Sequence, residues 1–313
     1  MLVAAAFAPH PPVIVPELAA GAADQLDRLR AACDQAVRRI LGAGPDRVVV
    51  LGAGPAARWD ESDAGTFAGY GVPLAVPLGA AAPAGAATGP GPVPGSPDGP
   101  PRRRWMPLSL TVGAWLLARA GYAGPRHAVS VPAAASDAEL ASLAGAVAAA
   151  AQGDAGAGDR RGAGAGGPDD AGHRVEAGGH GAADGRADAG GRVDIGAGGG
   201  APGTARAGSA AENGDRVGLL VMGDGSARRS LAAPGYLDAR AAEFDADIAA
   251  VLRAGDPAGL RALDPALGAD LLAAGVPAWR LAGWLAAGRQ FDADLLYDDA
   301  PYGVGYLVAV WLP

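Results

Sequence analysis

The chain has 313 residues and a formal net charge of −8, with 25 basic and 33 acidic side chains. This length suits one large domain or two small ones, and the negative charge argues against nucleic-acid binding, which needs clustered positive charge. A single cysteine excludes an internal disulfide framework and a cysteine-based zinc site. No apolar run reaches the roughly 18 residues of a membrane span. The first residues lack the basic region of a signal peptide, so we expect a cytoplasmic protein.

The first part of the chain predicts a strand, a helix and a second strand. Residues 2–8 read as a buried strand that ends at a proline cluster. Residues 17–41 predict a helix whose apolar positions recur every three or four residues, and Cys33 on that face is expected to be a buried, inert thiol. The apolar run RVVVL at 47–51 is typical of a strand in a parallel sheet that is covered on both faces. This order is a βαβ unit.

The remaining elements continue the alternation of helices and strands. The pattern predicts strands at 72–76, 127–131, 217–222, 293–297 and 304–312, and helices at 107–120, 136–151, 237–252 and 277–287. Ser136 and Glu139 form a capping box at the start of one helix. The pairs Asp256-Pro257 and Asp264-Pro265 each predict the start of a short helix.

Two segments predict no regular structure. Residues 80–104 are rich in proline, glycine and alanine and are expected to form a flexible loop. Residues 153–215 contain almost no large apolar side chain and cannot offset chain entropy, so we expect a disordered insertion. His173 and His180 fall inside it and are interpreted as incidental rather than as a metal-binding tail.

The expected fold is therefore a single α/β domain over residues 1–313, interrupted by this long disordered insertion. Its central sheet is expected to be largely parallel with helices on both faces, because neither ordered half has enough strands for a sheet of its own.

Three loops follow the carboxyl ends of predicted strands, where ligands bind in open α/β sheets. They contain the pocket candidates His10, Gly52, Gly54, Asp224 and Ser226. His10 follows a buried strand and is enclosed by prolines, although a histidine simply satisfied within its loop is an equal alternative. The Gly-Asp-Gly-Ser run also suits an ordinary turn.

The loop after RVVVL also matches a dinucleotide-binding pattern, GxGxxA at 52–57. That pattern needs a helix directly after it, and residues 58–65 show no apolar helical period. Nucleotide binding is therefore a distant alternative.

Five motifs carry a resemblance to a known family. They are APHPP at 8–12, RVVVLGAGP at 47–55, GDGSARR at 223–229, PGYLDARAAEFD at 234–245 and AAGVPAWRLAGWLAAG at 273–288. In this order they resemble the class III extradiol ring-cleavage dioxygenases of the B type and the related Memo proteins. The resemblance implies an α/β fold, a small aromatic ligand, and a non-haem Fe(II), held by two histidines and a glutamate, that splits a catechol ring with O₂. It also implies a homodimer or a second, different protein chain as partner.

The chain departs from the family pattern at most of the implied iron-site residues. His10 matches the first histidine ligand, but Gly52 to Gly54 stand where the second is expected, and Ala227 stands at the acid–base histidine. The glutamate ligand falls between 270 and 280, where Asp270 is the sole carboxylate. His127 starts its strand instead of ending it, which places it roughly 16 Å from the binding edge.

We therefore expect a divergent member that lacks the complete two-histidine, one-carboxylate site, with Fe(II) binding and catalysis both in doubt. Two alternatives remain open. One is an active oxygenase with an altered metal set of His10, Asp224 and Asp270, and the other is a non-catalytic binding or scaffold protein that acts through residues 153–215.

Overall fold

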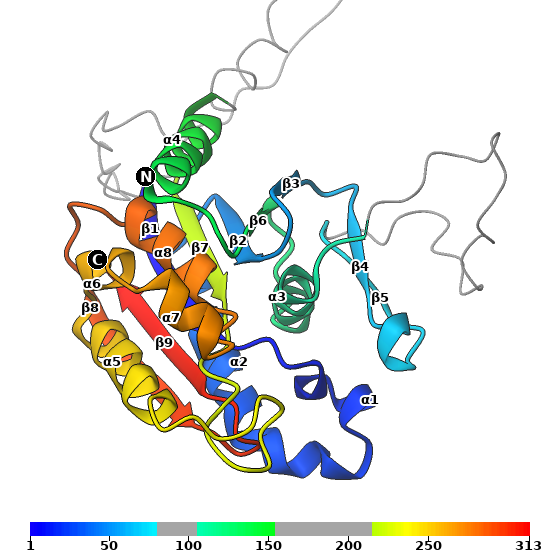
Figure 1. Cartoon of the computed structure of the whole chain (residues 1–313). Coiled ribbons are helices and arrows are strands. Elements are labelled where there is room, and N and C mark those ends of the chain that lie inside the picture. Colours follow the sequence, from blue (N-terminus) through cyan, green and yellow to red (C-terminus); the bar gives the residue numbers. More distant parts are fainter. Residues whose placement is uncertain (80–104, 154–214) are drawn as a thin grey trace, which may run out of the picture.

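The computed structural model describes residues 1–79, 105–153 and 215–313. The predicted loop 80–104, nearly all of the predicted insertion 153–215, and with it His173 and His180, lie outside the described residues. One sheet of seven strands organises the described part, in the order β3-β6-β2-β7-β1-β9-β8 (Figure 1). Its strands are β1 (Leu2–Ala8), β2 (Arg47–Ala53), β3 (Ala57–Trp59), β6 (Arg126–Val131), β7 (Val217–Met222), β8 (Asp292–Asp299) and β9 (Tyr306–Leu312).

The helices and a small second sheet account for the other regular elements of the described ranges. The second sheet pairs β4 (Ala64–Thr66) with β5 (Ala75–Pro77). The α-helices are α1 (Pro16–Ala19), α2 (Asp27–Gly42), α3 (Leu108–Arg119), α4 (Asp137–Gly153), α5 (Ala241–Ala254), α6 (Pro257–Arg261), α7 (Pro265–Asp270) and α8 (Val276–Leu285). Short 3-10 helices are η1 (Pro12–Ile14), η2 (Ala20–Leu26) and η3 (Ala68–Tyr70).

The main sheet is mixed, so the expectation of a largely parallel sheet holds only for its centre. The four central strands β6, β2, β7 and β1 run parallel to one another. The outer pairings, β3 with β6, β1 with β9 and β9 with β8, are antiparallel. For β8 and β9 the physical reason is a local connection, because the two strands form a hairpin and a short turn can join only antiparallel strands.

Both halves of the chain contribute to this one sheet, as the sequence predicts. Strand β1 lies between β7 and β9, and Ala5 is paired with Leu219 on one side and with Trp311 on the other. In Figure 1 the blue β1 runs between the yellow-green β7 and the red β9. The loops after β1 and β7 therefore leave the sheet at the same edge.

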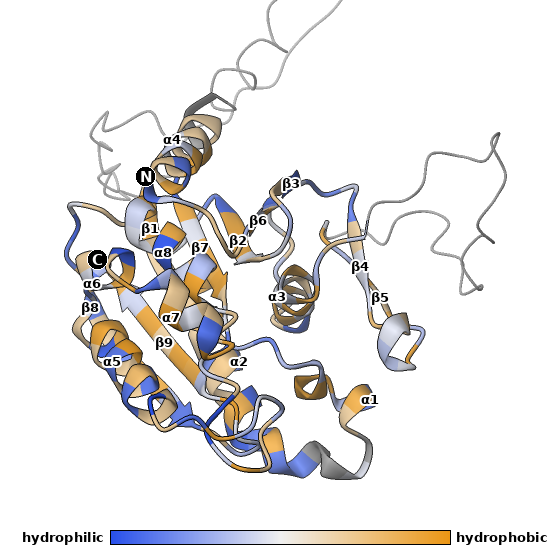
Figure 2. Ribbon diagram, viewed as in Figure 1, coloured by the Kyte–Doolittle hydropathy of each residue, from blue (hydrophilic) through white to orange (hydrophobic). Residues whose placement is uncertain are grey.

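Helices cover both faces of the sheet, which explains why its central strands are apolar throughout. One face packs against α4, α5, α6 and α8, and the other against α2 and α3. Figure 2 shows β9 mainly in hydrophobic colours, whereas α5 carries hydrophobic and hydrophilic residues side by side. Within the described ranges, no helix combines the length and apolar character needed to cross a membrane.

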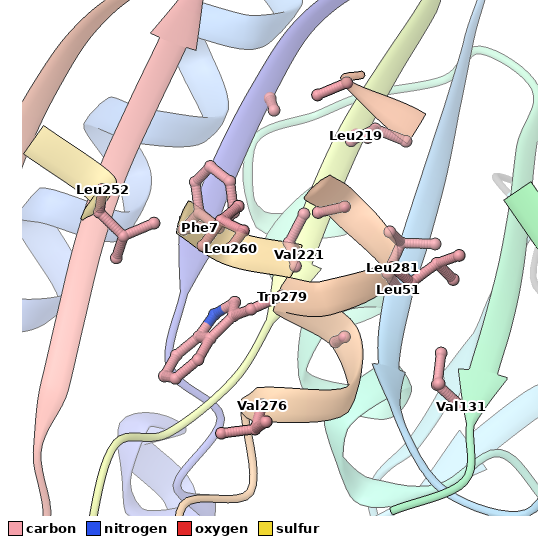
Figure 3. Packing of buried hydrophobic residues seen from close by; sticks show 14 of the residues in the cluster. Phe7, Leu51, Val131, Leu219, Val221, Leu252, Leu260, Val276, Trp279 and Leu281 are labelled. Carbon is pink, nitrogen blue, oxygen red and sulfur yellow. The ribbon is translucent and has the colours of Figure 1, made fainter. Parts of the chain in front are cut away.

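The first face has an aromatic centre. Trp279 of α8 is 1% exposed and belongs to the same cluster as Phe7 and Val221 (Figure 3). The Phe7 ring also contacts the Trp311 ring, with centroids 4.8 Å apart. Full burial of side chains of this size is worth about 1.5–3 kcal/mol each, so this layer holds β1, β7 and β9 together.

Several element boundaries differ from the sequence prediction. The helix predicted at 17–41 is divided into α1, η2 and α2. The strand predicted at 72–76 becomes β5 of the small sheet, and β3 and β4 were not predicted. Helix α5 begins at Ala241 instead of 237 because the Asp238 side chain accepts the Arg240 N–H and forms a turn there. The caps predicted at Asp256 and Asp264 are confirmed.

Candidate functional site

A pocket of about 520 Å³ lies where the carboxyl ends of β1 and β7 meet. Its size suits a small molecule. The loop after β1, the loop after β7 and the segment leading into β9 all contribute to its wall. The lining residues include Pro11, Pro12, Asp224, Ala227, Tyr302 and Tyr306.

The side chain of Asp224, in the loop after β7, links this loop to the loop after β1. Its Oδ1 accepts the His10 backbone N–H at 2.7 Å and lies 3.6 Å from His10 Nδ1. The latter distance is too long for a hydrogen bond and leaves an electrostatic contact. His10 is 8% exposed, and its Nδ1 is buried without a hydrogen-bond partner among the described residues. The structure thus brings these two predicted site residues together.

Burial shifts the pKa of two polar groups in the pocket, Asp224 and Tyr306. It raises the pKa of the Asp224 carboxyl above its ordinary value, although the adjacent His10 opposes the change. Burial, with the Asp224 charge nearby, also raises the pKa of Tyr306, so this phenol stays protonated at neutral pH. The Tyr302 hydroxyl donates to Gln25 Oε1 at 3.0 Å.

Ser226 supports the loop and does not line the pocket. It is fully buried, and its hydroxyl donates to the Leu271 carbonyl at 2.8 Å and accepts from the Arg228 N–H. The Ser226 N–H in turn donates to Asp245 at 2.8 Å, and Arg229 donates to the other oxygen of that carboxylate. Sequence reasoning missed the anchoring role of Asp245, for which the only signal was an acidic residue beside the apolar face of a predicted helix.

Gly52 and Gly54 serve the approach of α3 to β2 and do not line the pocket. A Cβ atom on Gly52 would lie 2.3 Å from Ser109 Oγ, and one on Gly54 would lie 2.6 Å from Pro107 Cγ. Their neighbour Ala53 lines a separate hollow of about 300 Å³, which shares Leu272 and Ala274 with the first. After Gly54 the chain enters β3, so this stretch lacks the helix start that a bound pyrophosphate requires.

The other residues implied for the iron site lie apart from His10 or lack the needed chemistry. Ala227 lines the pocket, but its methyl group cannot transfer a proton. The Asp270 side chain is 65% exposed, lies 3.6 Å from Arg240 Nη1 and is not part of the pocket wall.

His127 lies toward the opposite edge of the sheet. In the strand register His127 is level with Val49, Leu219 and Ala5, and its strand lies three strand spacings from β1. Ala5, the residue of β1 at this level, comes five residues before His10. This places His127 roughly 14 Å across the sheet and roughly 16 Å along it from His10. His127 Nε2 instead lies 3.3 Å from Arg47 Nη1.

The described residues around His10 therefore do not fit the implied iron. They supply one imidazole and one carboxylate, whereas the family's site needs two imidazoles and a carboxylate. Throughout residues 1–79, 105–153 and 215–313, no group of three or more histidine, cysteine or acidic side chains is placed to hold a metal. Comparisons with protein-family models and with curated proteins found no match to the chain.

Proposed function

We propose that this protein binds a small aromatic molecule in the pocket beside Asp224 and is a divergent relative of the class III extradiol dioxygenases without their iron chemistry. The observation that carries the proposal is the pocket itself. Two loops that resemble the family's site loops line it, and Ala227 stands in its wall where the family has its acid–base histidine.

The wall suits an aromatic ring. Most of its surface comes from prolines, aliphatic side chains and the two tyrosines, which favour a flat apolar ligand through burial of its surface. The polar groups are few, which is typical of pockets that orient a ligand by a small number of hydrogen bonds. Asp224 and the Tyr306 hydroxyl would hold the phenolic hydroxyls of such a ring.

A titration with catechol tests the proposal. We expect saturable one-site binding by calorimetry, because catechol combines an aromatic ring with two hydrogen-bond donors. Ala227→Phe, which fills the pocket, is expected to weaken binding at least about tenfold. Ala232→Phe is the matched control, because Ala232 is exposed in the same loop and does not line the pocket. Absence of binding, or equal loss in both variants, would refute the proposal.

An iron measurement separates this proposal from an active oxygenase with an altered metal set. The protein is loaded anaerobically with Fe(II), desalted and exposed to O₂ with catechol. We expect neither stoichiometric iron nor catechol-dependent oxygen uptake. If iron were retained in a one-to-one ratio, supported oxygen uptake and disappeared in His10→Ala, the altered-metal alternative would replace the proposal.

A further inference from the structure

We propose that the pocket selects ligands that carry a protonated amine next to their apolar body, with the Asp224 carboxylate as counter-ion. This inference rests on the proposed function and adds the charge class of the ligand.

The ionisable groups of the pocket wall favour a basic ligand. Of the described residues that line the pocket, only Asp224 has a carboxyl group, and none has an amine, guanidinium or imidazole. A ligand in the pocket therefore meets one carboxyl group and no basic side chain in the described wall.

The Asp224 carboxyl group has one oxygen without a hydrogen bond from the described residues. Its side chain is only 14% exposed, and its hydrogen bond from His10 uses Oδ1. The described residues provide no hydrogen bond to Oδ2. Oδ2 is not one of the fully buried unpaired atoms of the described residues, and Asp224 lines the pocket, so this oxygen is open to a hydrogen-bond donor on a ligand. An ammonium group on the ligand would supply the missing donor and the opposite charge.

Two aromatic side chains line the same pocket as the Asp224 carboxyl group. Tyr302 and Tyr306 line the same pocket, and aromatic faces attract ammonium groups when the two are close. The Tyr306 hydroxyl has no hydrogen bond within the described part of the chain, so it is able to accept from the same ammonium. A carboxylate on the ligand would instead be repelled by Asp224.

Three ligands of nearly equal size test this inference: 2-phenylethylamine, 2-phenylethanol and phenylacetate, titrated at neutral pH with ligand-observed NMR. We expect the amine to bind about tenfold more tightly than the alcohol, as a charge-assisted hydrogen bond predicts, and the acid to bind most weakly. Asp224→Asn keeps an oxygen for the His10 N–H and should bring the amine to the affinity of the alcohol. Asp247→Asn, an exposed change of equal charge on α5, should leave the order unchanged.

The outcomes distinguish this inference from the proposed function. If catechol binds but the alcohol or the acid equals or exceeds the amine, the amine preference is wrong and the aromatic pocket stands. An amine preference that survives Asp224→Asn also overturns it, because the charge would then lie elsewhere. If neither catechol nor any of the three binds, both fail.

Discussion

At the scale of single residues, Asp245 determines where the site loop lies. Its two oxygens accept from the Ser226 N–H and from Arg229, and its side chain is 1% exposed. The glycines around it leave room for that carboxylate: a Cβ atom on Gly305 would lie 2.1 Å from Asp245 Oδ2, and one on Gly225 would lie 2.7 Å from Oδ1. Asp245 therefore positions the loop that carries Asp224.

The burial of Asp245 predicts a pH dependence of stability. Burial is the largest influence on this carboxyl and raises its pKa above the ordinary 3.8, so the native state holds the proton more tightly than the unfolded chain. Its contribution is complete below 3.8 and is lost as the pH rises through the native value. The free energy of unfolding of the wild type should therefore fall relative to that of Asp245→Asn as the pH rises above about 4.

Urea unfolding of both proteins across this pH range measures the difference. The raised pKa of Asp224 changes stability in both proteins alike and cancels in the comparison. A wild type that gained stability over the variant as the pH rose would mean that Arg229 outweighs burial.

At the scale of elements, the packing of α3 on β2 depends on Gly52, because a larger residue there would collide with the helix. Gly52→Ala would bring a Cβ atom within 2.7 Å of Ser109 Cβ, which requires the helix to move. We expect a loss of about 1–3 kcal/mol in the free energy of unfolding, the usual cost of overpacking. Gly42→Ala is the matched control. A Cβ atom at Gly42 meets nothing within 4 Å, so this change should be nearly neutral. If Gly52→Ala and Gly42→Ala changed the free energy of unfolding equally in urea, α3 would be able to shift away from β2 without cost, and the prediction would be wrong.

The elements also show what sequence patterns determine. Strands β1, β2 and β7 were predictable because each is a continuous apolar run that is buried on both faces. Strands β3 and β4 have three residues each, too few for a period to be seen. The break before α2 was missed because the apolar spacing of residues 18–41 continues through η2.

The candidate site was likewise predictable only in part. The rule that ligands bind beyond the carboxyl ends of strands located His10 and Asp224, since it depends only on strand order. Tyr302 and Tyr306 were missed because they lie at the turn of an antiparallel hairpin, and this turn reaches the pocket edge only because β9 pairs with β1. Such a pairing between distant segments leaves no local sequence pattern.

At the scale of the whole molecule, the reactivity of Cys33 reports how often the core between the sheet and α2 opens. Cys33 is fully buried on α2 in the core cluster that packs against the second face of the sheet, and burial raises the pKa of its thiol well above the usual range. Only the thiolate reacts, so a thiol reagent should modify Cys33 only when the sheet and α2 separate. We expect modification of the folded protein to be at least about a thousandfold slower than of the urea-unfolded chain.

The control for Cys33 is a reporter on the surface of the same helix. The variant Cys33→Ala with Ala31→Cys carries its thiol at an exposed position two residues earlier and should react rapidly while folded. Saturating catechol should slow the modification of Cys33 further, because a ligand that binds only the native state lowers the population of the open form. It should leave the rate at position 31 unchanged. Rapid modification of Cys33 without urea would instead mean that α2 detaches from the sheet while the other elements stay folded.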